Sequence, residues 1–316
     1  MPLSSSKLAI AIPTYNRAGI LEENLRIMMP ELNRHAIPVY ISDDSSDQQT
    51  QALVERLRQD YADIHYQRNQ PGLGHDKNFF ATLGMVDHDY VWYMGDSVYC
   101  EPGCLQEILK AMKTGADFIF INSYVKDENS RLIGDTHVFL RERAWYLTLT
   151  GATVYGRRPR SLLIDDSRKV LWRNFVQLGM ILEYCSQHPA CVYWHGTPSL
   201  GFNKKKRSYW MKSALDVFVG DWTTLIKSFP VLFSEAEMKT VIRSHAVHTG
   251  IFGLKSLMFF RANEGLSVPI IKKHEKDYAV ASPTGVPMAY AVARIPVPLL
   301  RGLFKVFYFL RKLGRS

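Results

Sequence analysis

Three apolar runs in the first hundred residues each end in polar side chains, and this repetition constrains the fold more than any other feature. The runs, each with the polar residues that follow, are 7–12 with Thr14, 38–42 with Asp43 and Asp44, and 90–94 with Asp96. Continuous apolar runs of this length are typical of strands buried on both faces. Open α/β sheets bind ligands at the carboxyl ends of their strands. The three segments therefore predict one shared ligand site at the edge of a parallel sheet.

Strands and helices are predicted to alternate up to about residue 125. Strands are expected at 7–12, 38–42, 63–67, 90–94 and 117–122, and helices at 19–32, 50–61, 76–85 and 102–114. Asp47 is a candidate N-cap for the second helix. This alternation predicts a doubly wound α/β domain with right-handed crossovers.

The pattern changes after about residue 125. Residues 126–170 show no clear period, 173–187 have helical spacing, 190–194 form a short strand pattern, and 196–208 have the composition of a loop. Most of 214–260 has helical spacing, and 299–313 is an aromatic and basic helix pattern. We therefore expect one domain over 1–200 and a helical C-terminal region over 201–316, with a basic amphipathic tail at about 296–315.

Composition narrows the class of protein. The chain has 316 residues, of which 47% are hydrophobic, so it can bury a substantial core. The four cysteines form no CxxC pair, which favours a reducing compartment. No apolar stretch reaches the ~18 residues of a membrane span, and the short run before Pro13 does not suit a secretory signal. The net charge of +9 lies mostly in the second half, including Lys204–Arg207, where it indicates a solvated surface, a loop closing over phosphate, or an anionic partner.

Three motifs occur in order in the first half of the chain. They are I-P-T-Y-N-R at 12–17, D-D-S-S at 43–46, and Q-P-G-L-G at 70–74 followed by Lys77 and Asn78. Together they resemble the motifs of the family 2 glycosyltransferases, nearest to bacterial O-antigen, capsule and exopolysaccharide transferases. The resemblance implies an α/β, Rossmann-like nucleotide-sugar-binding domain of the GT-A fold.

The resemblance also implies a nucleotide-sugar site. The residues that it places there are Pro13, Thr14, Tyr15, Arg17, Asp43, Asp44, Lys77 and Asp96. Asp44 would accept a hydrogen bond from the nucleobase, and Asp43 would support its loop. Lys77 would contact the diphosphate. From the residues alone, the two aspartates could instead cap the next helix, and Lys77 could be a solvated helix charge.

The segment after the apolar run at 90–94 departs from the family pattern. Most members carry D-x-D, which holds a divalent cation on the donor diphosphate, whereas this chain has Gly95-Asp96-Ser97. Mg²⁺ and Mn²⁺ prefer oxygen ligands and need few from the protein. Asp96 and Ser97 are therefore candidate ligands for a weakened Mg²⁺ or Mn²⁺ site, with His195 as a third candidate. A lone histidine after a strand is more often a structural residue.

The catalytic base is a second departure. Inverting members place an aspartate at the start of the helix before the last core strand, where this chain has Gln177. A carboxamide does not accept a proton at neutral pH. Asp165 and Asp166, immediately upstream, are the candidate catalytic residues, whereas Glu183, on the helix itself, is equally well explained as a surface or ion-pair residue.

The resemblance implies inverting transfer of a hexosyl or deoxyhexosyl group from a nucleotide sugar to a hydroxyl of a lipid-linked or oligosaccharide acceptor. The alternative is a non-catalytic nucleotide-sugar-binding or scaffold subunit, which the two departures favour. The basic tail suits an anionic membrane surface, or packing on the domain or on a second subunit of a homo-oligomer. We expect a cytoplasmic protein, peripheral on the inner face of the cytoplasmic membrane, with no nucleic-acid partner.

Overall fold

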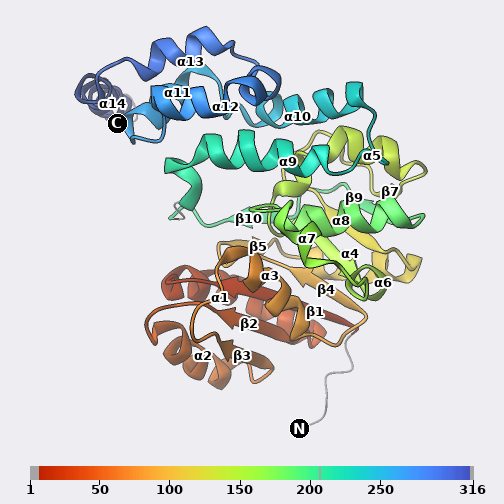
Figure 1. Cartoon of the computed structure of the whole chain (residues 1–316). Coiled ribbons are helices and arrows are strands. Elements are labelled where there is room, and N and C mark those ends of the chain that lie inside the picture. Colours follow the sequence, from red (N-terminus) through yellow and green to blue (C-terminus); the bar gives the residue numbers. More distant parts are fainter. Residues whose placement is uncertain (1–6, 206–207, 314–316) are drawn as a thin grey trace. The chain divides into compact units, whose positions relative to one another are not determined.

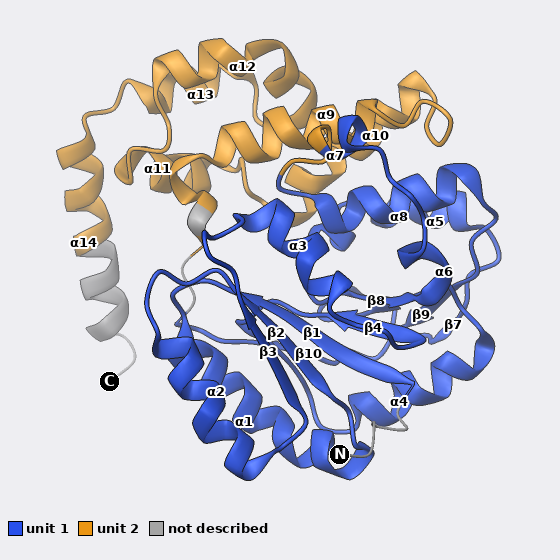
Figure 2. Ribbon diagram, turned by 60° about the horizontal axis from the view of Figure 1, so that its bottom comes forward, with its two compact units in different colours: residues 1–169, 174–206 blue, residues 170–173, 207–316 orange. Residues whose placement is uncertain are grey.

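The structure is a computed structural model, which describes residues 7–205 and 208–313. It divides into two compact units, coloured separately in Figure 2. Unit 1 consists of residues 1–169 and 174–206, and unit 2 of residues 170–173 and 207–316. Unit 1 therefore runs slightly past the predicted boundary at 200, and a four-residue segment within it is assigned to unit 2. Lys206, Arg207 and Arg315, which belong to the predicted basic loop and tail, lie outside the described residues.

Unit 1 is built on a mixed sheet, several strands of which are labelled in Figure 1. The strand order is β3-β2-β1-β4-β8-β6-β9-β7. The strands are β1 (Leu8–Thr14), β2 (Val39–Asp43), β3 (Ile64–Arg68), β4 (Tyr90–Tyr93), β6 (Phe118–Ile121), β7 (Arg131–Leu132), β8 (Thr153–Gly156) and β9 (Val192–His195). β1 pairs in parallel with β2 and with β4, and β6 pairs in parallel with β9. β8 is antiparallel to both of its neighbours, β4 and β6.

Helices cover both faces of this sheet, as the strand–helix alternation predicts. The helices before β9 are α1 (Ala18–His35), α2 (Gln49–Asp60), α3 (His75–Gly84), α4 (Cys104–Ala111), α5 (Thr136–Arg143), α6 (Arg157–Arg160), α7 (Asp166–Val170) and α8 (Val176–Gln187), with 3₁₀ turns η1 (Met112–Thr114) and η2 (Tyr146–Thr148). Alternate strand residues such as Ile10 pack in one buried cluster with α1, α2 and α4. On the opposite face, Phe79 of α3 contacts Tyr93, and Tyr184 of α8 contacts Phe118. Burial of both faces explains why the strands have continuous apolar runs.

The helices and strands between residues 126 and 170 were not predicted from the sequence. This segment contains β7, α5, η2, β8, α6 and α7. β8 inserts antiparallel into the sheet, so the sheet is mixed rather than parallel. Its four residues are too short to show a period, and its place depends on pairing with strands distant in sequence.

Three further expectations were wrong in detail. The helix predicted at 173–187 begins at Val176, because Asn174 has a left-handed φ of 64°. The loop predicted at 196–208 contains β10 (Leu200–Phe202), which pairs antiparallel with β5 (Val98–Cys100). The N-cap of α2 is Gln48 rather than Asp47, although the Asp47 carboxylate accepts the Gln49 N–H at 3.0 Å.

Unit 2 is helical. Its elements are η3 (Tyr209–Lys212), the π-helix η4 (Asp216–Asp221), α9 (Trp222–Lys227), α10 (Glu235–Thr249), α11 (Leu254–Ala262), α12 (Val268–Ala281), α13 (Val286–Ala293) and α14 (Val297–Leu313). Its core includes His245, which stacks on Phe218 with ring centroids 4.8 Å apart. Within the described ranges, every helix is too short or too polar to cross a membrane.

One face of α14 packs within unit 2. Leu300 is completely buried, and Phe304 meets Phe259 of α11 edge to face. Arg301 donates to the Ala262 carbonyl at 2.9 Å and pairs with Glu264 at 2.7 Å. The helix is therefore anchored to α11 along part of its surface.

Candidate functional site

The three polar segments meet at one edge of the sheet, as predicted. β1 lies between β2 and β4, and Thr14 is in register with Asp43. Because β8 is antiparallel to both β4 and β6, β6 runs in the same direction as β4. β9 is parallel to β6 and therefore has this direction too. The edge that carries Thr14, Asp44 and Asp96 consequently also carries Asn122, after β6, and His195, at the end of β9.

Asp44 is buried and holds the β3–α3 loop. One carboxylate oxygen accepts a hydrogen bond from Asn69 Nδ2 at 2.7 Å, and the other accepts the Gly74 N–H at 2.7 Å. The Asp44 N–H donates to the Thr14 carbonyl at 3.0 Å. Because Gln48 is the N-cap of α2, the helix-capping alternative for Asp44 is wrong. Asp44 instead ties the ends of β1, β2 and β3 together.

Asp43 supports the turn beside Asp44. It accepts the Ser45 N–H at 2.9 Å and the Tyr66 hydroxyl at 2.8 Å. Burial of Tyr66, with the Asp43 carboxylate beside it, raises the pKa of the Tyr66 phenol well above its ordinary value. Tyr66 therefore remains a hydrogen-bond donor throughout the neutral range.

The asparagine of the third motif is also part of this scaffold. Asn78, on the first turn of α3, accepts the Ser42 hydroxyl at 2.6 Å, and Asn69 donates to the same hydroxyl at 3.0 Å. All three side chains are buried. Lys77, the adjacent residue, is exposed. The motif thus combines a buried polar network with one solvent-facing cation.

The β1–α1 loop presents Tyr15 and Arg17. Tyr15 is 61% exposed, the largest exposure among the bulky aromatic side chains that the structure describes. Asn16 has a left-handed φ of 52°, donates its N–H to Ser45 Oγ at 2.8 Å and accepts the Ser46 N–H at 3.0 Å. These bonds tie the loop to the end of β2 and leave the Tyr15 ring open to a ligand.

Asp96 is buried and joined to both ends of this loop. Thr14 donates to Asp96 Oδ2 at 3.2 Å, and Arg17 Nη1 lies 3.2 Å from Oδ1. Asn24 of α1 donates to the Asp96 carbonyl at 2.8 Å. The carboxylate therefore has a cationic partner within the protein.

The described residues around Asp96 do not provide a ligand set for a divalent cation. In residues 7–205 and 208–313, no cluster of three or more His, Cys, Asp or Glu side chains could hold a metal ion. Asp96 is ion-paired with Arg17, and His195 Nε2 lies 2.8 Å from Ser199 Oγ. Ser97 Oγ is buried and has no hydrogen-bond partner in the described part of the chain. As arranged, these residues do not fit a metal, because a cation would have to displace Arg17.

His195 is held in its neutral form. It is 3% exposed, and burial lowers the pKa of its imidazole below the ordinary value. Its hydrogen bond with Ser199 closes the turn after β9. The geometry therefore accounts for His195 as a structural residue, and its role as a metal ligand stays a prediction.

Gln177, at the position of the expected base, is satisfied within unit 1. It is buried, and its Nε2 donates to the Thr148 carbonyl at 3.0 Å. Thr150, two residues further on, packs against Gly95, with its Cγ2 3.3 Å from the position that a Cβ would take there. Two successive contacts, from Gln177 to Thr148 and from Thr150 to Gly95, thus connect Gln177 with the loop that carries Asp96.

The two candidate base residues differ in their surroundings. Asp165 accepts the Ser167 N–H at 2.7 Å, and its carbonyl accepts the N–H of Lys169, so it caps α7. The hydrogen bonds from Ser167 lower the pKa of Asp165. Asp166 is 92% exposed and forms an ion pair with Lys169 at 2.8 Å. No described contact joins either carboxylate to Asp96 or Thr14, so their catalytic role stays a prediction.

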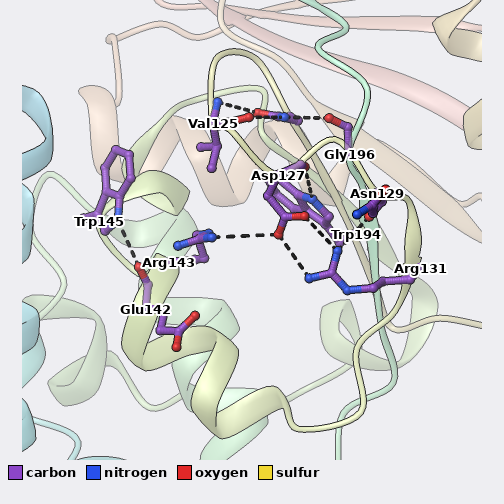
Figure 3. Close-up of polar contacts among 10 residues, drawn as sticks. Val125, Asp127, Asn129, Arg131, Glu142, Arg143, Trp145, Trp194 and Gly196 are labelled. Carbon is purple, nitrogen blue, oxygen red and sulfur yellow. Dashed lines mark hydrogen bonds and ion pairs between the residues drawn. The ribbon is translucent and has the colours of Figure 1, made fainter.

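A loop that was not predicted from the sequence follows β6 at the same edge of the sheet. Figure 3 shows Asp127 held by Arg131, with two hydrogen bonds of 2.9 and 3.0 Å, and by Arg143 at 3.8 Å. Trp194 Nε1 donates to the Asp127 carbonyl at 2.8 Å. Arg131 is the main cause of the lowered pKa of Asp127, which makes this carboxylate a poor base. The Asp-Arg spacing of four residues was the available sequence signal, but it is common on surfaces.

Asn122 clamps this loop onto β9. Its Nδ2 donates to the carbonyls of Val125 at 2.8 Å and Gly196 at 2.6 Å, and its Oδ1 accepts the Val125 N–H. A Cβ on Gly196 would lie 2.4 Å from the Glu128 carbonyl carbon, so the close approach requires glycine. The loop therefore has a defined conformation beside the candidate site.

The helix-flanked mixed sheet and the polar carboxyl edge define a GT-A architecture. A sequence profile of glycosyl transferase family 2 matches residues 9–166, half of the chain, and the chain belongs to this family. The family resemblance predicted from the motifs is confirmed.

Two curated relatives match shorter segments. Abequosyltransferase RfbV of Salmonella typhimurium is 38% identical over 90 residues, which are 28% of this chain and 27% of that protein. The GalNAc(5)-diNAcBac-PP-undecaprenol beta-1,3-glucosyltransferase of Campylobacter jejuni is 25% identical over 127 residues, 39% of this chain and 40% of that protein. The matches thus span well under half of each relative.

Among solved structures, S. aureus TarS 1–349 is similar along most of the chain. Its TM-score is 0.57 at 13% identity, covering 91% of this chain and 90% of that one. The same fragment in complex with UDP-GlcNAc gives 0.56 at 14% identity, with the same coverage. At these identities the likeness shows the fold alone, and it confirms the predicted GT-A domain with a helical C-terminal region.

Proposed function

We propose that this protein transfers a sugar from a nucleotide-sugar donor to a hydroxyl of a bacterial surface glycan. The observation that carries the proposal is the convergence of Thr14, Asp44 and Asp96 at one sheet edge in a chain of glycosyl transferase family 2. The exposed ring of Tyr15 beside them suits a nucleobase or ribose, because such sites combine an apolar surface with a few fixed polar groups.

The reaction proposed is a single displacement with inversion. The acceptor hydroxyl oxygen attacks the anomeric carbon, the bond from that carbon to the donor diphosphate breaks, and a carboxylate takes the hydroxyl proton. Asp166 is the better candidate for this base, since Asp165 is engaged in capping α7. The nucleoside diphosphate is the leaving group.

A lipid-linked acceptor is supported by the nature of one relative and by α14. The C. jejuni relative is named for a sugar chain on undecaprenol diphosphate. Two leucines of α14, Leu299 and Leu303, are 59% and 53% exposed and lie four residues apart on one helix face. With exposed Lys305 nearby, they suit contact with an anionic membrane.

Calorimetry with UDP, GDP, CDP and dTDP tests donor binding. We expect one of the four to bind, and Tyr15→Ala to weaken its binding without changing the melting temperature, because Tyr15 is exposed. Asp44→Asn should weaken it as well. Tyr290→Ala, in unit 2, is the matched control and should bind normally.

Turnover separates this function from that of a non-catalytic binding or scaffold subunit. Gln177 at the expected position of the base favours this second alternative. We expect release of the nucleoside diphosphate from its sugar conjugate to depend on a polyprenyl-diphosphate-linked acceptor. Binding of the nucleotide sugar with no release in the presence of such acceptors would support the scaffold. Unchanged affinity in both Tyr15→Ala and Asp44→Asn would contradict the site.

A further inference from the structure

The Asp96 carboxylate needs a positive partner because it is buried. Its side chain is 7% exposed, and an isolated ionised carboxylate in such a place is costly. Arg17 meets this need at 3.2 Å, and Thr14 donates to the other oxygen. A D-x-D motif obtains its positive partner from solution, as a metal ion. In this chain a side chain supplies that positive charge.

The neighbouring position adds no second negative charge. Ser97 is neutral, and its hydroxyl is buried without a hydrogen-bond partner among the described residues. Asp44, the other buried carboxylate at this edge, is already held by Asn69 and the Gly74 N–H. Divalent cations bind where hard, negatively charged oxygens are uncompensated. The charge that would attract a cation to Asp96 is largely cancelled by Arg17.

We propose, resting on the proposed function, that Arg17 takes the place of a divalent cation and neutralises the donor diphosphate. A guanidinium is always protonated and carries five N–H donors in a planar fork. One such group can contact a carboxylate and a phosphate at the same time. Arg17 would therefore stay on Asp96 while it binds the diphosphate and stabilises the negative charge that develops on the leaving group.

The position of Arg17 supports this role. It is the N-cap of α1, an 18-residue helix with no acidic residue in its first turn and no side-chain cap. The helix dipole places partial positive charge at this end, which favours an anion beside Arg17. Its side chain is 27% exposed, so it is accessible to a ligand while it contacts buried Asp96.

Nucleotide binding with and without metal tests the proposal. UDP, GDP, CDP and dTDP are titrated by calorimetry in EDTA and in Mn²⁺, and bound Mn²⁺ is followed by electron paramagnetic resonance. We expect the wild type to bind its nucleoside diphosphate with the same affinity in both buffers. Arg17→Met should lose about tenfold or more in EDTA, because a charge-assisted contact is removed. Mn²⁺ should restore its affinity and appear as a bound signal, since Asp96 has then lost the positive charge of Arg17.

Three further variants complete the test. Arg26→Met removes another ion-paired arginine of α1, which contacts Glu22 and Asp60, and should behave as the wild type. Arg17→Lys keeps the charge and should not gain Mn²⁺ binding. Ser97→Asp should gain it, and this variant keeps the proposal testable if Arg17→Met does not fold.

The possible outcomes separate the two proposals. Wild-type binding that requires Mn²⁺ would overturn the role of Arg17 and leave the proposed function intact. Arg17→Met affinity equal to that of Arg26→Met in EDTA would also overturn it. If none of the four nucleoside diphosphates binds the wild type in either buffer, the proposed function itself fails, and the role of Arg17 fails with it.

Discussion

Gln177 Nε2 donates to the carbonyl oxygen of Thr148 at 3.0 Å, and this bond fixes the first turn of α8 on the η2 turn. The same turn leads through Thr150 to Gly95 and so to Asp96. A residue aligned with the family's base thus acts, in this chain, as a brace between the last core helix and the candidate donor site.

We expect Gln177→Ala to cost about 1–3 kcal/mol of unfolding free energy, because a buried side chain is truncated and the Thr148 carbonyl loses its donor. The measurement is urea denaturation followed by circular dichroism. Gln187→Ala, on the same helix, is the control: Gln187 is exposed and bonds only to Glu183 among its described contacts, so its loss should be within about 0.5 kcal/mol. Equal losses in both variants would show that Gln177 is not a brace.

Asp166→Asn should lower the rate of sugar transfer by about 100-fold or more, because a general base typically contributes at least that factor. Nucleotide affinity should be unchanged, since the predicted donor residues precede position 100. Asp165→Asn is the matched control. An asparagine still accepts the Ser167 N–H and caps α7, so its rate should stay within about tenfold of the wild type. A rate that falls in Asp165→Asn and not in Asp166→Asn would reverse the assignment.

The stability of the protein should fall in acid because of His245. Burial lowers the pKa of this imidazole to about 3, from 6.5 in the unfolded chain. Between these values the unfolded state binds a proton that the folded state does not. The stabilisation is therefore fully present above pH 6.5 and is lost as the pH falls from 6.5 toward 3.

His245→Phe should remove this loss. Its unfolding free energy should fall by about 2 kcal/mol less than that of the wild type between pH 6 and pH 4. A phenyl ring can replace the imidazole that stacks on Phe218, and His245 Nδ1 has no hydrogen-bond partner among the described residues. Urea denaturation at both pH values measures the difference. His248→Gln, at an exposed site one helical turn away, removes only the smaller cause of the lowered pKa of His245 and should keep most of the wild-type dependence.

Leu299→Ser combined with Leu303→Ser should weaken binding to phosphatidylglycerol vesicles by more than about tenfold, because each exposed leucine would otherwise bury apolar surface in the membrane. Stability should be unchanged, since packing of α14 on α11 depends on Leu300 and Phe304. Vesicle co-sedimentation measures the binding, and added salt should weaken it.

The control for the membrane proposal is Val247→Ser on α10, which alters an equally exposed apolar residue elsewhere in unit 2. It should sediment as the wild type does. If the wild type does not bind the vesicles, or if the leucine substitutions instead dissociate a dimer in sedimentation velocity, the exposed face of α14 is not a membrane surface.

Much of the polar edge could be predicted because it is local in origin. Thr14, Asp44 and Asp96 each follow an apolar run, and adjacent parallel strands bring such positions together without any further information. The family motifs added the identity of the ligand class. What could not be predicted was which partner each polar group takes. Asn69, Asn78 and Tyr66 bond to residues of this edge that lie 23 to 36 positions away in the sequence.

By itself, the sequence determined the secondary structure of the first 125 residues apart from the short strand β5, the family and the place of the ligand edge. Strand and helix periodicity, together with turn residues, are properties of neighbouring positions, and burial on both faces reinforces them. Only the tertiary structure decided that β8 enters the sheet antiparallel and that Arg17 pairs with Asp96. Both depend on groups far apart in the chain, 79 residues for the ion pair. Such pairings form because a buried charge needs a partner and a strand edge needs a neighbouring strand. They join residues far apart in the sequence, so no local sequence pattern predicts them.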